Sequence, residues 1–181
     1  MPKLYYDTAF WHQWPVTLGI SSKGLKLLEF RSEEQLLQKG SHKPDEQWIH
    51  DPAALEPYMK QVMAYFRGER HTFDLNLDLQ GTDFQMRIWD FLLSIPYGKV
   101  ASYQAAATAA GNSKAVRAAG MANNRNPVSV VVPCHRVVGK NGTLTGYGGG
   151  LDLKESLLKL EGIQVFNGRI REDASWMNSK S

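Results

Sequence analysis

The feature that most constrains the fold is a change of pattern near residues 79–83. Before it, apolar residues gather in short β-prone runs, and after it they recur mainly at helical spacing. The chain has 181 residues, which is long enough for two small units. We therefore expect an α+β protein: an α/β scaffold domain over residues 1–80, a second domain over residues 81–167, and a polar tail over residues 168–181.

The first domain is predicted to contain an antiparallel sheet and one long helix. Strands are expected over residues 14–20, 25–30 and 73–79. The first two are joined by a turn-rich segment and predict a hairpin. The polar segment 38–50 predicts a loop. Asp51 followed by Pro52 predicts the start of a helix that ends at Gly68.

The second domain has the outline of a winged helix-turn-helix. Thr82 is expected to begin one helix, Ser102 a short helix that ends at Gly111, and Ser113 another that runs to about Asn123. Two helices joined by a turn with glycine are typical of a helix-turn-helix. Further elements are expected as a buried strand over 128–132, a hairpin turn at 141–142 and an amphipathic helix over 151–161.

Composition and charge narrow the function only slightly. The formal charge of +3 permits contact with nucleic acid without identifying it. No apolar run has the eighteen or so residues of a membrane span, and the N-terminus lacks a signal pattern. We therefore expect a protein of the cytoplasm, associated with the nucleoid in a prokaryote, or of the nucleus in a eukaryote.

Cys134 is the only cysteine, so an internal disulfide and a multi-thiolate metal site are excluded. Most lone cysteines are small buried hydrophobes. A free thiol with a pKa near 8.5 is only about 3% thiolate near pH 7, so a nucleophilic Cys134 needs a lowered pKa. His135 is the adjacent base, although a bend or a bridging water must link it to the sulfur. The residues alone leave both interpretations open.

The sequence around Cys134 resembles the O6-alkylguanine-DNA alkyltransferases. The matching positions are Asn126, Pro127, Pro133, Cys134, His135, Arg136, Val137, Gly146, Tyr147, Gly148, Gly149, Lys154, Glu155 and Glu161. Upstream they continue through Gly81, Thr82, Phe84, Gln85, Trp89, Ile95, Pro96, Tyr97, Gly98, Ser102, Tyr103, Gln104, Arg117, Ala118 and Gly120. The resemblance covers about residues 81–162. Many members carry serine where this chain has Gly148, which places a side-chain contact there in doubt.

The resemblance implies a catalytic group of five residues. Cys134 would accept the alkyl group, His135 would take the thiol proton through a water, and Glu161 would orient His135. Tyr103 would donate a proton to the guanine leaving group and help to rotate the phosphate. Lys154 would hydrogen-bond near the cysteine.

The resemblance also implies a DNA-binding helix and a base pocket. Arg117 would fill the gap left by the flipped base, and small residues would let the helix approach the minor groove: Ala115, Ala118, Ala119 and Gly120. Asn126 would brace the turn before the active site, and the carbonyls of Cys134 and Val137 would accept from the guanine amino group. Tyr147, Gly148 and Gly149 would line the pocket.

The implied function is DNA repair by irreversible, stoichiometric transfer of a methyl or other alkyl group from guanine O6 in duplex DNA to Cys134. We expect the protein to need no cofactor and no metal, and to be a monomer. Activity on O4-alkylthymine and cooperative binding stay open. Three alternatives were weighed against this function. A non-catalytic lesion binder is disfavoured by the presence of Cys134, and a cysteine hydrolase or redox protein is disfavoured because this chain has no second, resolving cysteine. A transcriptional regulator is disfavoured by the alanine-rich second helix.

Overall fold

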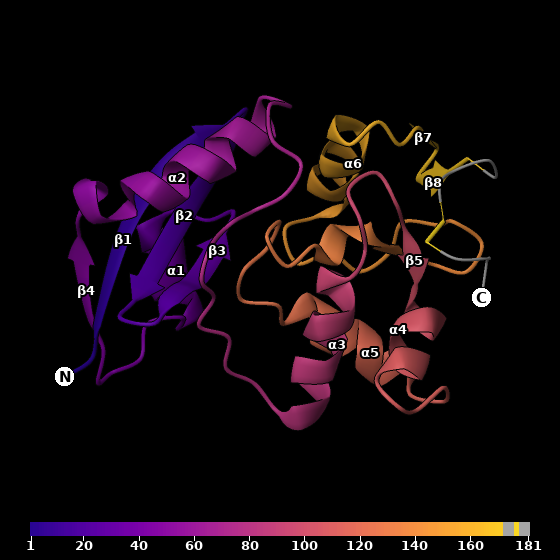
Figure 1. Ribbon diagram of the computed structural model, residues 1–181, viewed down its shortest axis with the longest axis horizontal. Coiled ribbons are helices and arrows are strands. Elements are labelled where there is room, and N and C mark those ends of the chain that lie inside the picture. The colour runs from indigo at the N-terminus through magenta and orange to yellow at the C-terminus, as the bar shows by residue number, and fades with distance from the viewer. Residues whose placement is uncertain (172–175, 178–181) are drawn as a thin grey trace. The chain divides into compact units, whose positions relative to one another are not determined.

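The computed structural model describes residues 1–171, 176 and 177. It divides into two compact units, Met1–Leu79 and Gln80–Ser181 (Figure 1). Unit 1 is an α/β unit and unit 2 is mainly helical, so the chain is α+β overall. No helix among these residues is long and apolar enough to span a membrane.

Unit 1 is built on a four-stranded sheet in the order β3-β2-β1-β4. The strands are β1 (Lys3–Trp11), β2 (Trp14–Ser21), β3 (Gly24–Glu29) and β4 (Gln47–His50). The predicted hairpin is confirmed, since β2 and β3 pair antiparallel. β4 pairs with β1 in parallel, so the sheet is mixed rather than wholly antiparallel as expected.

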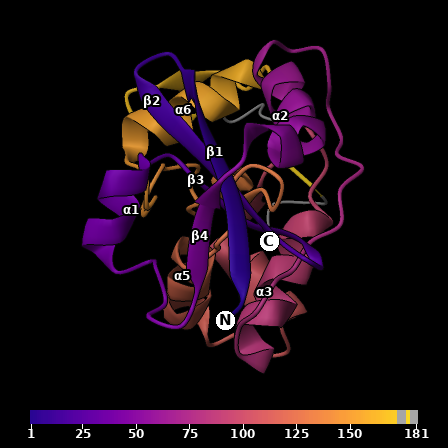
Figure 2. The same cartoon turned by 90° about the vertical axis from the view of Figure 1, so that its left-hand side faces the viewer.

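Two helices accompany this sheet: α1 (Glu33–Lys39) and α2 (Pro52–Phe66). The predicted start of α2 is confirmed, because the Asp51 carboxylate accepts from the Ala54 amide at 3.0 Å. Leu55 and Val62 on α2 are fully buried, and α2 packs against β1 and β2. In Figure 2 the strands of unit 1 run between α1 and α2, so the core of the unit lies on the sheet.

Two predictions for unit 1 are wrong. Residues 38–50 are not all loop, because β4 fills the edge beside β1. Residues 73–79 do not form a strand, because only Leu77 makes a β-bridge, with Leu25. In both places the missing information is the same: a local pattern does not show which sheet edge is free for pairing.

The three helices that open unit 2 pack together at one end of it (Figure 1). They are α3 (Asp83–Leu93), α4 (Tyr103–Ala109) and α5 (Val116–Asn124). The predicted caps Thr82 and Ser102 are confirmed, since their side chains accept from backbone amides three residues on. Ser113 is not a cap, because α5 starts after Ala115 and has no side-chain cap bond.

The rest of unit 2 places the cysteine between short elements. A 3-10 turn, η1 (Cys134–Arg136), leads into β6 (Val137–Val138), which pairs in parallel with β5 (Ala101–Ser102). The predicted last helix is confirmed as α6 (Leu151–Leu160). It packs against η1.

A hairpin follows α6, formed by β7 (Val165–Phe166) and β8 (Arg169–Ile170). Ile170 is buried in an apolar cluster with Leu158 and Ile163. The predicted tail is therefore wrong at its start, because residues 169–170 belong to the folded unit. Residues 172–175 and 178–181 of that tail lie outside the described residues.

The predicted strand over residues 128–132 is wrong, and two tight turns replace it. Val130 has φ +73°, and the Val131 amide donates to the Ser129 carbonyl at 2.9 Å, which closes a three-residue turn. A second such turn at Pro133 is closed by the Cys134 amide and the Val132 carbonyl at 2.8 Å. β-Branched residues favour a strand, and valine rarely adopts a positive φ, so the sequence did not indicate this bend.

Candidate active site

Cys134 lies just after the two tight turns, at the start of η1, with only 4% of its surface exposed. Its carbonyl accepts from the Asn123 side-chain amide at 3.3 Å. The thiol is the only one in the chain. The backbone therefore fixes where the sulfur lies, and little of it is open to solvent.

Asn126 holds the turns before the cysteine. Its side-chain nitrogen donates to the Val132 carbonyl at 2.6 Å, and its side-chain oxygen accepts from the Val128 amide at 3.0 Å. These two contacts fix which end of the amide is nitrogen. They are consistent with the predicted bracing role, and the amide nitrogen keeps a second hydrogen for the Cys134 sulfur.

Burial raises the pKa of the Cys134 thiol above its ordinary value. Hydrogen bonds from Asn126, Tyr147 and Ser129 to the sulfur oppose this effect, as does the charge of Lys154. The net direction is upward, so the expectation of a lowered pKa is wrong. The sequence could not show how completely neighbouring residues enclose the sulfur, and a base must therefore take the proton for the thiolate to form.

His135 and Glu161 form a buried pair behind the cysteine. His135 Nε2 lies 2.5 Å from Glu161 Oε2, and neither side chain is exposed. Burial lowers the pKa of His135, and Glu161 opposes that effect only in part, so the imidazole is neutral near pH 7. A neutral imidazole held by a carboxylate can accept a proton, which is the chemistry expected of this pair.

Arg136 binds the other side of Glu161, a contact that the sequence did not reveal. Its Nε donates to Glu161 Oε1 at 2.8 Å and its Nη1 to the Ile95 carbonyl at 2.6 Å. The Gly98 amide also donates to Glu161 Oε1, at 2.9 Å. Burial alone would raise the pKa of Glu161, but His135 and Arg136 together hold it well below its ordinary value, so the carboxylate stays ionised.

Lys154 and Tyr103 meet on the other side of the site. Lys154 is fully buried and donates to the Thr145 carbonyl at 3.0 Å and to the Tyr103 hydroxyl at 3.3 Å. The Tyr103 hydroxyl donates to the same carbonyl at 2.8 Å. Burial lowers the pKa of Lys154 to about 8 and raises that of Tyr103. The structure thus brings both predicted catalytic residues together.

The predicted pocket loop lies over the N-terminus of α6. Tyr147 is half-buried, and Lys154 Nζ lies 5.9 Å from the centre of its ring. Gly149 permits close packing, because a Cβ there would meet Leu153 Cδ2 at 2.4 Å. Gly148 is exposed. Val137 is fully buried in β6, and the predicted use of its carbonyl for the base stays a prediction.

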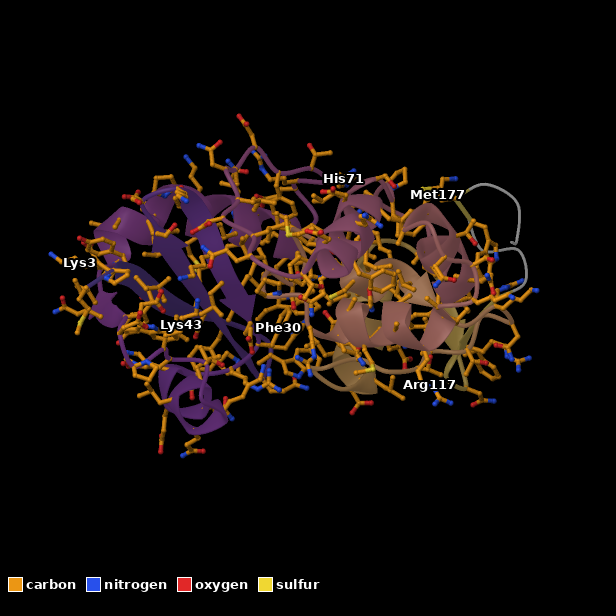
Figure 3. The ribbon with its side chains drawn as sticks, turned by 90° about the horizontal axis from the view of Figure 1, so that it is seen from below. Lys3, Phe30, Lys43, His71, Arg117 and Met177 are labelled. Atoms are coloured by element: carbon orange, nitrogen blue, oxygen red, sulfur yellow. The ribbon has the colours of Figure 1, made fainter. Side chains whose placement is uncertain are left out.

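α5 presents a partly cationic face to solvent. Arg117 and Ala118 are exposed, and Figure 3 shows Arg117 at the periphery of unit 2. Ala115 and Gly120 are half-buried. Ala119 is fully buried, so it packs inside the unit and does not belong to the exposed face predicted for it.

One hollow in unit 2 is separate from this site. It has a volume of about 650 Å³ and lies beside the C-terminal end of α6, lined in part by Lys159, Ile163 and Phe166. Cys134 is not among the residues that line it. No cluster of His, Cys, Asp and Glu that could hold a metal occurs within residues 1–171, 176 and 177.

Fold and site together define a two-unit protein with a single buried cysteine and, behind it, a buried histidine–glutamate pair in the helical unit. Two family models match the chain. The model described as "6-O-methylguanine DNA methyltransferase, ribonuclease-like domain" matches residues 4–79. The model described as "6-O-methylguanine DNA methyltransferase, DNA binding domain" matches residues 83–163.

Curated relatives and solved structures agree. The methylated-DNA–protein-cysteine methyltransferase of Methanosarcina barkeri is 42% identical over 158 residues, 87% of this chain and 97% of that protein. The one from Mycobacterium tuberculosis is 47% identical over 145 residues, 80% and 85% of the two chains. A crystal structure of the M. tuberculosis protein in complex with DNA is 42% identical, with a TM-score of 0.76 over 87% of this chain and 92% of that one. The chain belongs to the O6-methylguanine DNA methyltransferase family.

Proposed function

We propose that this protein repairs alkylated DNA by moving the alkyl group from guanine O6 onto Cys134, once per molecule. The observation that carries the proposal is the buried His135–Glu161 pair next to a single cysteine, in the unit that matches the DNA-binding family model. A non-catalytic lesion binder would have no use for this pair.

The reaction begins with removal of the thiol proton. His135, neutral and oriented by Glu161, takes the proton from the sulfur, directly or through a water. The thiolate then attacks the alkyl carbon in line, so that the sulfur–carbon bond forms as the bond between that carbon and guanine O6 breaks. A thioether has no ready hydrolytic exit, so the transfer is irreversible and needs no cofactor.

Tyr103 and Lys154 act on the leaving group. Guanine accumulates negative charge as its O6 bond to carbon breaks, and the Tyr103 hydroxyl supplies a proton. Burial keeps Tyr103 protonated, because it raises the pKa of the phenol. The Lys154 ammonium, 3.3 Å from the Tyr103 oxygen, stabilises the charge that remains on that oxygen.

The substrate is duplex DNA from which the damaged nucleotide is extruded, because guanine O6 is otherwise inside the stack. Arg117 enters the duplex from the exposed face of α5 and fills the gap. Exposed Lys114 and Arg125 flank it and suit contact with phosphates. The protein acts as a monomer where the DNA is, in the cytoplasm of a prokaryote or the nucleus of a eukaryote.

Mass spectrometry after mixing with a duplex that contains O6-methylguanine tests the proposal. The expected result is one methyl group per molecule, on the peptide that bears Cys134. The variant Cys134→Ala should bind the same duplex and accept no methyl group. A duplex with plain guanine is the negative control, and methyl transfer beyond one equivalent would contradict single use.

Arg117→Ala separates extrusion from chemistry. This variant should react slowly with duplex and at the unchanged rate with free O6-benzylguanine, because only the duplex needs its base extruded. Lys114→Ala is the matched control: loss of one phosphate contact should weaken binding and leave the rate at saturating DNA intact. Equal loss on duplex and free base in Arg117→Ala would remove its role.

A further inference from the structure

Arg136 binds both oxygens of the carboxylate that holds His135. Besides the contact with Oε1, its Nε lies 3.2 Å and its Nη2 3.1 Å from Glu161 Oε2, the same oxygen that lies against His135 Nε2. Only 7% of the Arg136 side chain is exposed and none of the Glu161 side chain is, so water and salt screen this ion pair weakly. The charge of the guanidinium therefore acts at close range on the pair behind the cysteine.

The turn after α3 fixes the guanidinium in this place. The Ile95 carbonyl accepts from Arg136 Nη1, and the centre of the Tyr97 ring lies 5.8 Å from Arg136 Cζ. The Tyr97 hydroxyl donates to the Leu160 carbonyl at 3.2 Å, which ties this turn to the C-terminal end of α6. Burial raises the pKa of Tyr97, so the phenol stays neutral and adds no charge of its own.

Two opposite charges next to His135 decide whether its imidazole carries a second proton. A buried carboxylate in hydrogen-bond contact favours the protonated imidazole, and Glu161 has this effect. The positive charge of Arg136 opposes it, and that of Lys154 on α6 acts in the same direction as Arg136. With Arg136 on the same carboxylate, Glu161 can orient the imidazole without drawing a proton onto it.

We propose that Arg136 is a positioning residue of the reaction: by binding both oxygens of Glu161, it keeps the His135 imidazole neutral and able to take the Cys134 proton. This role rests on the proposed function, because it takes Cys134 as the alkyl acceptor. The proton leaves the sulfur for His135, directly or through a water, and the guanidinium keeps its own protons throughout. Arg136 acts on this step through Glu161.

The test measures two quantities in the full-length protein. The first is the pKa of His135, from the NMR shift of its ¹³C-labelled ring; its signal among the five histidines is identified by its loss in His135→Gln. The second is the single-turnover rate of methyl transfer from duplex O6-methylguanine at saturating protein, as a function of pH. The variants are Arg136→Gln, which removes the charge, and Arg136→Lys, which keeps it. Arg31→Gln is the matched control, because Arg31 pairs with Glu29 in unit 1, at 2.8 Å.

Arg136→Gln should raise the pKa of His135 by about one unit or more and slow transfer about tenfold at about pH 6, relative to the unchanged protein, because one unit changes the neutral fraction up to tenfold. The two rates should converge above about pH 8.5, where the imidazole is neutral in both proteins. Arg136→Lys should keep the pKa of His135 and the shape of the pH profile, since it keeps the charge. Arg31→Gln should match the unchanged protein in both measurements.

Two results in Arg136→Gln would overturn the role: an unchanged pKa of His135, or a rate that falls equally at every pH, which is the mark of a distorted site. If Arg136→Gln does not fold, Arg136→Lys decides, because an upward shift of its pH profile would show that the charge is not what matters. None of these results touches the proposed function, since the unchanged protein would still transfer its methyl group. Failure of the unchanged protein to methylate Cys134 would instead remove the proposed function.

Discussion

Gly148 is a residue at which the pocket can be altered by one side chain. Its φ lies outside the left-handed region, and a Cβ there would meet only the Asn124 carbonyl oxygen, at 3.7 Å. A serine therefore fits without strain and would add a donor for the base oxygen. We expect Gly148→Ser to raise the rate of transfer from O6-methylguanine about threefold to tenfold, since one hydrogen bond contributes roughly 1 kcal/mol.

Gly149→Ser is the control for this prediction. Its Cβ would meet Cδ2 of the fully buried Leu153 at 2.4 Å, so the Leu153 side chain, the loop or α6 must shift. We expect slower transfer and a lower melting temperature. Single-turnover kinetics and thermal melting measure both variants, and a slower reaction in a fully stable Gly148→Ser would show that the added hydroxyl has no partner.

Arg136 and Glu161 form a buried ion pair in which each residue needs the other. Glu161→Gln would leave the Arg136 charge buried without its anion, which typically costs about 3 to 5 kcal/mol. We expect a loss of this order in the free energy of unfolding, measured with urea. Arg136→Lys keeps the charge but loses the planar fork, so its loss should be smaller.

At the residue scale the sequence predicted the cysteine and the residues that its family resemblance assigns. It missed the contact of Arg136 with Glu161 and the two tight turns before the cysteine, for two physical reasons. The backbone reverses at Val130, and a positive φ at valine leaves no local signal in the sequence. Arg136 acts through Glu161, twenty-five residues away in the chain, and that distance closes only in the folded unit.

At the element scale, Ser102 caps the helix whose first residue is Tyr103, the residue proposed to protonate the leaving group. It accepts from the Ala105 amide at 3.0 Å and so begins α4, whose first residue is Tyr103. We expect Ser102→Ala to lower the free energy of unfolding by about 1 kcal/mol and to slow transfer, because Tyr103 loses its fixed backbone. Ser113→Ala should change neither, because Ser113 caps no helix.

Urea denaturation and single-turnover kinetics check this pair of variants. A loss of stability as large in Ser113→Ala as in Ser102→Ala would show that the connection between α4 and α5 depends on both serines. A stable Ser102→Ala with the normal rate would show that packing alone positions Tyr103.

The starts of α2, α3 and α4 were predicted correctly, because a cap and its amide lie three residues apart and the signal is local. The helix α1 was not predicted, although Ser32 and Gln35 form a capping box there, and Ser113 was wrongly predicted to be a cap. β4 and residues 73–79 were predicted badly, because a strand needs a free sheet edge far away in sequence. Residues 128–132 are the sharpest failure. Their β-branched side chains favour a strand, but the contacts of Asn126 hold them in turns.

At the scale of the whole molecule, the buried pair makes stability depend on pH. The pKa of His135 is lowered in the folded protein, so as the pH falls below about 6.5 this histidine gains a proton in the unfolded chain before it does in the folded one. Protonation therefore stabilises the unfolded chain and lowers the free energy of unfolding. The pKa of Glu161 is also lowered, so the same holds below about 4.5. We expect the free energy of unfolding to be nearly constant near pH 7 and to fall steadily from about pH 6.5 downward.

Urea denaturation at a series of pH values between 7.5 and 4 measures this decline. The variant His135→Gln, which cannot gain the histidine proton, should show a smaller decline above pH 5 than the unchanged protein. An equal decline in both proteins would mean that other groups cause the acid sensitivity.

Because Lys154 is buried, alkylation of Cys134 changes the balance of charge inside the site. Among the described residues no carboxylate pairs with this buried ammonium, and the Cys134 sulfur is the group whose negative charge stabilises it. An unreacted molecule can reach electroneutrality there by ionising the thiol. Once the sulfur is a thioether it can no longer ionise, and only loss of the Lys154 proton makes the site neutral. The pKa of Lys154 should therefore be lower in the alkylated protein than in the unreacted protein.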